Sequence, residues 1–261
     1  MKTLVINLAS EPSRWAAVRR QFESVGLEPL RVEAVCGRTL APDRIARIYS
    51  DALNRASYHE PLRPGEIGCY ASHITVWQQL LAQHEPWVAV FEDDVEIDAD
   101  LPQTLAAIER LSVDWDVVKL IGRRREKTAA RMHLTGKTAL IRYRRVPGLT
   151  SAYVIHRRGA EKLLAHRLPF GRPIDIDLRH WWECDLRVFG VSPYPTRLAP
   201  SSLLSTIDGR RGPAPAGARL RKFMLQARYS VLNWHASAVE RWRGGRGDAV
   251  RPATLQNRPV R

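Results

Sequence analysis

Residues 87–95, WVAVFEDDV, constrain the fold more than any other stretch of this chain. Five apolar residues run directly into three carboxylates, Glu92, Asp93 and Asp94, after the turn signal Glu85-Pro86. A short continuous apolar run with such a boundary is typical of a strand buried on both faces, near the centre of a parallel sheet. Ligands of open α/β sheets bind beyond the carboxyl ends of the strands, so these acids lie where a ligand is expected.

Three adjacent acids repel one another, and taking them out of water is costly unless a cation compensates. Hard oxygen ligands at a strand end suit Mg²⁺ or Mn²⁺, which proteins often hold with one or two carboxylates and substrate phosphates. The alternative for an isolated Glu-Asp-Asp is a solvated acidic turn that caps a helix beginning at Val95. The sequence on either side of these acids is needed to distinguish a metal site from a helix cap.

Strands and helices alternate in the pattern on either side. Residues 3–8 and 29–35 read as strands around a helix that begins at Pro12 and ends at Gly26, which is the start of a parallel sheet. Residues 123–145 read as an Arg-rich loop with one short strand at 138–143. Further helices are expected at 66–83, 101–111 and 159–166, and further strands at 115–121, 151–156 and 186–191. Residues 174–178 are expected to lead from a loop into a Trp- and His-rich helix that continues through Glu183.

Composition narrows the class of protein. Of the 261 residues 44% are hydrophobic, which indicates a globular chain, and no apolar run approaches the roughly 20 residues of a membrane span. The first residues form too short an apolar run for a signal peptide and read as a strand. The three cysteines are too few and too irregularly spaced for a disulfide framework or a Cys-type zinc site, and they fit a reducing cytosol.

Positive charge is concentrated at the C-terminal end. The net charge is +14, and from Asp208 onward 12 Lys and Arg stand against three acids. Residues 208–218 read as a Gly/Pro linker, 219–246 as a basic amphipathic helix and 247–261 as a disordered tail behind a catalytic domain at 1–207. The apolar face of the helix comprises Leu220, Phe223, Ala227, Val231, Trp234, Ala238 and Trp242. Such a tail suggests an anionic partner, either a membrane, a nucleic acid or an acidic glycolipid.

The order of short motifs resembles the glycosyltransferase family 25 enzymes of bacterial lipooligosaccharide and lipopolysaccharide synthesis, which include β-1,4-galactosyltransferases. The resemblance runs from about residue 3 to about residue 207. Cys36 departs from it, because the family pattern has Asp there, which leaves any role of position 36 in doubt. The motifs are INL at 6–8, EAVCGRTL at 33–40, PGEIGCYASH at 64–73, VAVFEDDVEI at 88–97, WDVVKLIG at 115–122, SAYVIHRRGAEKLL at 151–164 and PIDIDL at 173–178.

The resemblance implies an α/β fold of the GT-A-like, Rossmann-related kind, a mixed sheet with helices on both faces. It implies a UDP-sugar donor, most often UDP-galactose, an inverting reaction and a lipid-linked saccharide acceptor. Glu92 and Asp94 match the metal-binding DxD-type motif for Mn²⁺ or Mg²⁺, and Asp93 falls on the donor side. The implied location is the cytoplasmic face of the membrane, where the basic helix would bind the anionic surface as a peripheral anchor.

Other positions have a functional and a structural interpretation. Asp175 and Asp177 are the candidates for base catalysis, although an acid there is also a good helix cap. On the donor side are Asn7, Arg14, Glu66 and His73; Arg14 is otherwise an exposed helix residue and His73 a buried core histidine. Ser151 and Tyr153 are expected on the acceptor side, with Tyr153 otherwise a core residue.

Two alternatives to this function remain open, and one alternative for the C-terminal helix. The donor could be another nucleotide-sugar, as in a glucosyltransferase. From a different class, the basic charge and eight Trp would fit a nucleic-acid-binding protein, but the charge is confined largely to the tail and no recognition motif appears. The C-terminal helix could also fold back onto the catalytic core, since a Trp stripe at helical spacing is more often core than membrane anchor.

Overall fold

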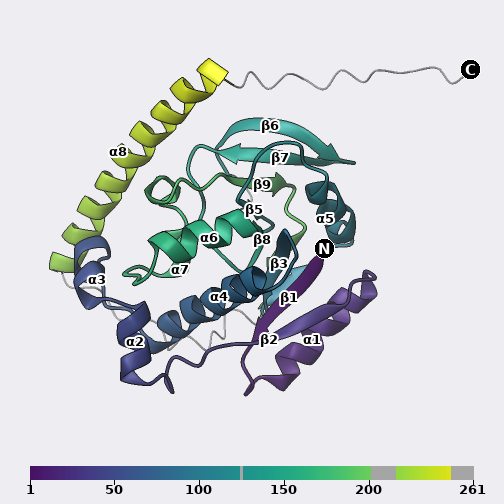
Figure 1. Ribbon diagram of the computed structural model, residues 1–261, viewed down its shortest axis with the longest axis horizontal. Coiled ribbons are helices and arrows are strands. Elements are labelled where there is room, and N and C mark those ends of the chain that lie inside the picture. The colour runs from purple at the N-terminus through teal and green to yellow at the C-terminus, as the bar shows by residue number, and fades with distance from the viewer. Residues whose placement is uncertain (124–125, 201–215, 248–261) are drawn as a thin grey trace, which may run out of the picture.

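A computed structural model describes residues 1–123, 126–200 and 216–247, and Figure 1 shows its arrangement. Eight strands form one mixed sheet in the order β2-β1-β3-β8-β5-β9-β7-β6. The strands are β1 (Lys2–Asn7), β2 (Pro29–Glu33), β3 (Trp87–Glu92), β5 (Val117–Lys119), β6 (Thr128–Thr135), β7 (Thr138–Tyr143), β8 (Ala152–His156) and β9 (Val188–Ser192).

The first three strands are parallel, with β1 between β2 and β3. β8 lies antiparallel to both β3 and β5, so β5 runs in the same direction as β3. The carboxyl ends of β1, β3 and β5 and the beginning of β8 therefore meet at one edge of the sheet. Val88, Ala89, Val90 and Phe91 of β3 are all buried, because helices cover both faces of this strand.

Helices cover the two faces of the sheet (Figure 1). On one face α1 (Pro12–Ser24) and α5 (Leu101–Glu109) contribute Val18, Phe22, Leu105 and Ile108 to the core. On the other face lie α4 (Pro64–Ala82), α6 (Arg157–His166) and α7 (Ile174–Asp177), with Trp77 of α4 fully buried. This arrangement confirms the expected α/β class, a mixed sheet with helices on both faces.

Several elements differ from the sequence-based prediction. Residues 128–143 form a hairpin, β6 and β7, where one strand was expected, because the exposed Ala129, Ala130, Arg131 and His133 on β6 hid the strand pattern. Residues 174–178, expected to lead from a loop into a helix, contain the short helix α7, and the helix expected through Glu183 is only a 3₁₀ turn at Trp181–Glu183. Two short helices, α2 (Pro42–Ile48) and α3 (Asp51–Ser57), precede α4. The predicted linker and tail lie largely outside the described residues, and the predicted helix is part of α8 (Ala216–Gly247).

A close backbone contact fixes α4 on the end of β2. A Cβ on Gly37 would lie 1.7 Å from the carbonyl oxygen of Pro64, and one on Gly68 would lie 2.5 Å from the carbonyl oxygen of Val35. Only glycine leaves room for these two segments to meet. The hydroxyl of Ser72 accepts a hydrogen bond from the backbone N–H of Val35 at 2.8 Å. Two of the recognised motifs, EAVCGRTL and PGEIGCYASH, thus serve one packing contact that places α4 over the sheet edge.

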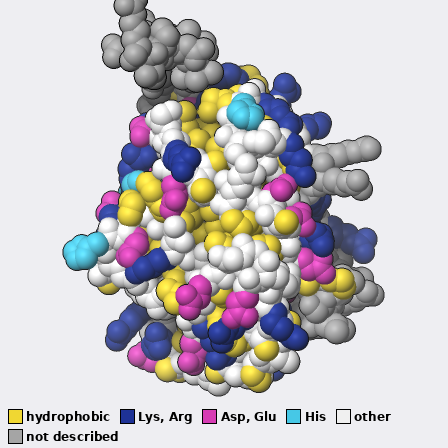
Figure 2. Space-filling view, turned by 90° about the vertical axis from the view of Figure 1, so that its right-hand side faces the viewer, with side chains coloured by type: hydrophobic (Ala, Val, Ile, Leu, Met, Phe, Trp, Pro, Cys, Tyr) yellow, Lys and Arg dark blue, Asp and Glu magenta, His cyan; other side chains and the backbone are white. Residues whose placement is uncertain are grey.

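Charge on the body of the molecule is mixed. On the face that Figure 2 shows, Lys and Arg lie among Asp and Glu side chains with hydrophobic side chains between them. Within the ranges that the structure describes, no helix combines the length and the hydrophobicity that spanning a bilayer requires.

Candidate functional site

The three consecutive acids sit in a turn at the carboxyl end of β3. Glu92 is the last residue of β3, and Asp93 and Asp94 form the turn into β4 (Val95–Ile97). β4 pairs antiparallel with β10 (Thr196–Leu198), and the N–H of Ala199 donates to the carbonyl of Asp94 at 2.8 Å. A strand, and not a helix, follows the acids, so the helix-cap interpretation of this motif is wrong.

Asp93 is held by two side chains from the first βα unit. Asn7, at the end of β1, donates its amide Nδ2 to Asp93 Oδ2 at 2.6 Å, and Arg14 of α1 places Nη2 2.6 Å from Oδ1. Asn7 is buried, and the side chain of Arg14 is 22% exposed. Arg14 is thus the member of this group that a ligand can reach, while Asn7 and Asp93 orient it.

Glu92 is held from the opposite side. His73 in the middle of α4 places Nε2 3.3 Å from Glu92 Oε1, and Ser151 donates its hydroxyl to Oε2 at 3.2 Å. The ring of His73 is fully buried below the carboxylate. The prediction that His73 lies near the donor diphosphate therefore does not fit, because the ring reaches the ligand side only through Glu92.

Tyr153 also lies inside the core. Its hydroxyl is 2.8 Å from His73 Nδ1 and accepts a hydrogen bond from Trp77 Nε1 at 3.1 Å. The residue is 2% exposed, so it cannot touch an acceptor. The acceptor-binding role predicted for Tyr153 is replaced by a positioning role, in which it orients His73. Ser151 stays at the strand edge beside Glu92.

Asp94 carries the clearest sign of a missing partner. Its Oδ1 is buried and accepts no hydrogen bond from any residue of the described ranges. Burial and the neighbouring Glu92 raise the pKa of Asp94 to about 7, although Arg14, with Nη2 4.0 Å from Oδ2, acts against this. Three carboxylates against one guanidinium leave two negative charges, which one divalent cation would balance. Glu92 and Asp94 therefore fit Mg²⁺ or Mn²⁺, which prefer oxygen ligands.

A second ligand set borders this site. One ligand atom each from Cys69, His73 and Glu92 lie within 4.8 Å of one another, close enough for a metal ion. Burial, together with the charges of Glu92, Asp175 and Asp94, raises the pKa of the Cys69 thiol well above its usual range, which opposes the thiolate that a metal requires. Both ring nitrogens of His73 are already engaged. The oxygen ligands of Glu92 and Asp94 are therefore the better cation site.

The charge of Asp175 interacts with that of Glu92, so Asp175 borders the same site. Burial raises its pKa, while Lys119 at the end of β5 lowers it. Lys119 is itself buried and donates to the carbonyls of Pro147 and Gly148 at 3.1 Å each and to that of Leu149, which holds this loop in place. Gly148 lies against Asp175, since a Cβ there would be 3.2 Å from Oδ2. An acid with a raised pKa beside a fixed loop is a suitable general base.

Glu66 lies near Asp175 at the beginning of α4. One of its oxygens accepts a hydrogen bond from the backbone N–H of Arg63 at 2.8 Å, which caps the helix. Burial raises the pKa of Glu66, and the charge of Asp175 adds to this effect. The predicted donor-side residue thus caps α4 and also borders the site.

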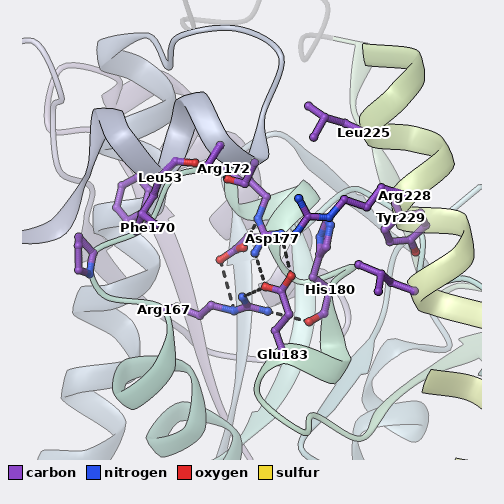
Figure 3. A pocket seen from close by; sticks show the side chains of 15 residues that line it. Leu53, Arg167, Phe170, Arg172, Asp177, His180, Glu183, Leu225, Arg228 and Tyr229 are labelled. Carbon is purple, nitrogen blue, oxygen red and sulfur yellow. Dashed lines mark hydrogen bonds and ion pairs between the residues drawn. The ribbon is translucent and has the colours of Figure 1, made fainter. Parts of the chain in front are cut away.

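Asp177 is not part of this group. Both oxygens accept buried hydrogen bonds, Oδ2 from the hydroxyl of Tyr70 at 2.6 Å and Oδ1 from Arg172 Nε at 2.7 Å. Figure 3 shows Asp177 among Arg167, Arg172 and Glu183, beside a cavity of about 320 Å³ that α3 and α8 also line. The catalytic role predicted for Asp177 does not fit, because its lone pairs are used in an ion-pair network away from the strand edge.

The sequence analysis missed Lys119 and Cys69. Lys119 is the single charge within the apolar run Val117–Ile121, and a lone cation at the end of a buried strand was the available signal. Nothing in the local sequence of Cys69 indicates that α4 would place its thiol near the charges of Glu92, Asp94, Asp175 and Glu66. These contacts depend on α4 crossing the sheet edge.

Comparisons with known proteins agree with the motifs. Residues 1–177 match the model of Glycosyltransferase family 25 (LPS biosynthesis protein). A relative from Rattus norvegicus, named probable inactive glycosyltransferase 25 family member 3, is 30% identical over 222 residues, 74% of this chain and 37% of the relative. Procollagen galactosyltransferase 1-A of Xenopus laevis is 27% identical over 212 residues, 78% of this chain and 34% of the relative.

The chain therefore spans little more than a third of the length of these curated relatives. Among solved structures, a Drosophila β-1,4-galactosyltransferase 7 mutant in complex with manganese, UDP-Gal and xylobiose aligns with a TM-score of 0.38 and 7% identity, over 81% of this chain and 75% of that one.

Proposed function

Because the chain belongs to glycosyltransferase family 25, we propose that it transfers a hexose, with galactose as the first candidate, from a UDP-sugar to a saccharide acceptor with the help of Mn²⁺ or Mg²⁺. The observation that carries this proposal is Asp94 in the turn after β3, whose buried Oδ1 has no hydrogen-bond partner among the described residues and whose pKa is raised to about 7. A carboxylate in that state gains most from a divalent cation beside it, and the same cation can bind the phosphates of a donor.

Each group at the strand edge would have one task. A divalent cation held by Glu92 and Asp94 would neutralise the leaving diphosphate. Arg14 reaches the same side and would add a second positive charge to the phosphates, with Asn7 and Asp93 fixing its position. His73 and Ser151 hold Glu92 so that its carboxylate does not rotate during the reaction.

Asp175 would take the proton of the acceptor hydroxyl. Its raised pKa makes it a stronger base than an ordinary Asp, and Lys119 stabilises its charged form. A base on the acceptor side with direct attack on the sugar gives an inverting reaction. The family description, which names lipopolysaccharide biosynthesis, supports a lipid-linked saccharide as the acceptor. With such an acceptor the proposed reaction would take place at the cytoplasmic face of a membrane.

Relatives of this chain carry names of both kinds, galactosyltransferases and inactive family members, so an assay must decide. Purified chain is incubated with each UDP-sugar and Mn²⁺, with and without a lipooligosaccharide-core acceptor, and UDP release is measured. We expect release with UDP-galactose that depends on Mn²⁺ and is stimulated by the acceptor. A collagen peptide serves as the second acceptor. No release with any UDP-sugar, together with no UDP binding, would refute the proposal.

A further inference from the structure

The C-terminal helix α8 is fixed to the body of the protein by one face. Tyr229 and Asn233 on this face are each 5% exposed. Trp181 donates its Nε1 to Asn233 Oδ1 at 3.2 Å, and Asn233 donates its Nδ2 to the carbonyl of Arg144 at 2.9 Å. These paired polar contacts set the rotation of the helix about its own axis.

Aromatic and cationic groups surround Tyr229 as well. Its ring centroid is 5.1 Å from that of His180 and 5.4 Å from that of Trp182. The guanidinium groups of Arg179 and Arg145 lie 4.6 Å and 5.0 Å from the ring centroid, a cation–π arrangement. The helix is therefore bound along an aromatic seam, and the face that Tyr229 occupies is not available to a partner.

The opposite face is apolar and exposed. Phe223 is 72% exposed, Val231 64% and Trp234 67%, and Leu220 and Met224 are exposed beside them. At 3.6 residues per turn these side chains point to one side of the helix and Tyr229 and Asn233 to the other. The apolar stripe that the sequence predicts thus faces outward, and the helix does not bury it against the catalytic domain.

Contiguous exposed apolar surface of this kind marks a docking site. The helix has 32 residues and is about 48 Å long at 1.5 Å per residue, so the stripe is an extended strip rather than a pocket. Figure 1 shows α8 along the outside of the domain. A long strip on a convex surface suits a flat partner better than it suits a small ligand.

The charges beside the stripe have one sign. Arg219, Arg228 and Arg241 are exposed, and Glu240 is the single acid of α8. Glu240 forms an ion pair with Arg142 of β7 and so does not offset them. The surface shown in Figure 2 is different, because acidic and basic side chains are mixed there. Cationic side chains along an aromatic and aliphatic strip are complementary to an anionic lipid surface.

We propose that α8 lies in the plane of an anionic bilayer surface, with Phe223, Val231 and Trp234 inserted among the lipids and the basic side chains at the head groups. The body of the protein is then held on the solvent side through Tyr229 and Asn233. This proposal is independent of the transfer reaction, because none of these three apolar residues lies at the strand edge that carries the acids.

The test uses the full chain in co-sedimentation with vesicles of phosphatidylcholine alone or mixed with phosphatidylglycerol. We expect binding to the anionic vesicles that weakens as salt is added. The triple variant Phe223→Ser, Val231→Ser, Trp234→Ser should bind at least about tenfold more weakly with an unchanged melting temperature. The control variant Leu30→Ser, Leu198→Ser removes two exposed apolar side chains on β2 and β10 and should bind like the wild type.

Three results would overturn the proposal. The first is no binding of the wild type to anionic vesicles, or equal binding by the triple variant. The second is a much lower melting temperature of the triple variant, which would mean that protein covers the strip in solution. The third is a wild-type dimer in light scattering that the triple variant converts to monomer, with no vesicle binding by either, which would assign the strip to a second copy. UDP release is measured on the same samples, so that a failure of membrane binding can be distinguished from a failure of the proposed transfer reaction.

Discussion

His73 Nε2 lies 3.3 Å from Glu92 Oε1, which joins the middle of α4 to the end of β3. A carboxylate only accepts hydrogen bonds, so in a neutral imidazole the proton is on Nε2 and Nδ1 accepts from Tyr153. Trp77 Nε1 in turn donates to the hydroxyl of Tyr153. A buried chain of hydrogen bonds therefore reaches from the core to the acid that we assign to the metal.

Tyr153→Phe should interrupt the hydrogen bonds that connect Trp77 to His73. Trp77 and His73 would each lose a buried partner, at a cost of about 1–3 kcal/mol of unfolding free energy, and Glu92 would lose its fixed orientation. We expect a lower melting temperature together with reduced turnover. Tyr49→Phe, which removes a hydroxyl 3.0 Å from Asp51, is the control and should leave turnover unchanged. Full activity in Tyr153→Phe would show that these hydrogen bonds stabilise the fold and have no role in turnover.

Asp94→Asn should preserve the fold and abolish transfer. The amide removes the charge that holds the cation beside the diphosphate, which should lower turnover by about a hundredfold or more. Calorimetric titration with Mn²⁺ in the presence of UDP should show the same loss of binding. Asp185→Asn, at a side chain that is 87% exposed, is the matched control. Wild-type Mn²⁺ affinity in Asp94→Asn would place the metal elsewhere.

Asp175→Asn should lower turnover by about 10²–10⁴-fold and leave the affinity for UDP nearly unchanged, since a general base acts in the transition state. Because burial raises the pKa of Asp175, wild-type activity should increase with pH through a value above the 3.8 of an ordinary Asp. That acid limb should be absent from the residual rate of the variant. Lost UDP affinity at unchanged turnover would assign Asp175 to the donor side.

Asp177→Asn should act on stability instead. It removes the buried charge that faces Arg172 and Arg167, and breaking a buried ion pair costs about 3–5 kcal/mol. We expect a marked fall in the midpoint of urea unfolding, while the folded fraction retains its turnover at low temperature. An inactive variant with wild-type stability would restore the catalytic assignment of Asp177.

Glu183 should make stability depend on acidity. Burial opposes its ionisation, but hydrogen bonds from Arg172 and Arg167 outweigh this and lower the pKa of Glu183 to about 2 from an ordinary 4.5. A lowered folded-state pKa stabilises the fold above pH 4.5, and this contribution is lost as the pH falls from about 4.5 toward 2. In Glu183→Gln the melting temperature should vary less with pH across this range. An unchanged slope would contradict the assignment.

Local sequence patterns were sufficient to identify the family, to predict the parallel strands at the beginning of the sheet and to place the three acids at a strand end. The apolar run at 87–91 and the carboxylates that follow can only be satisfied by a buried strand with its polar end at a sheet edge. Asn7 and Arg14 followed from their places after the first strand. Where exposed residues interrupt the alternation, as on β6, the pattern failed, because that strand is held by pairing with β7 and not by a buried face of its own.

Tertiary structure decided which of the candidate residues face a ligand. Asp175 and Asp177 are two residues apart and indistinguishable in the sequence. In the structure Arg172 and Tyr70 bind the carboxylate of Asp177, whereas Asp175 interacts with Lys119 and borders the site. His73 and Tyr153 belong to the core, because α4 packs on the sheet with His73 directed toward Tyr153 of β8. The sequence determined that the helix after residue 215 has an apolar face and a basic border. Only the contacts of Tyr229 and Asn233 decided that this face points outward, since a helix with polar partners on one side is bound by that side.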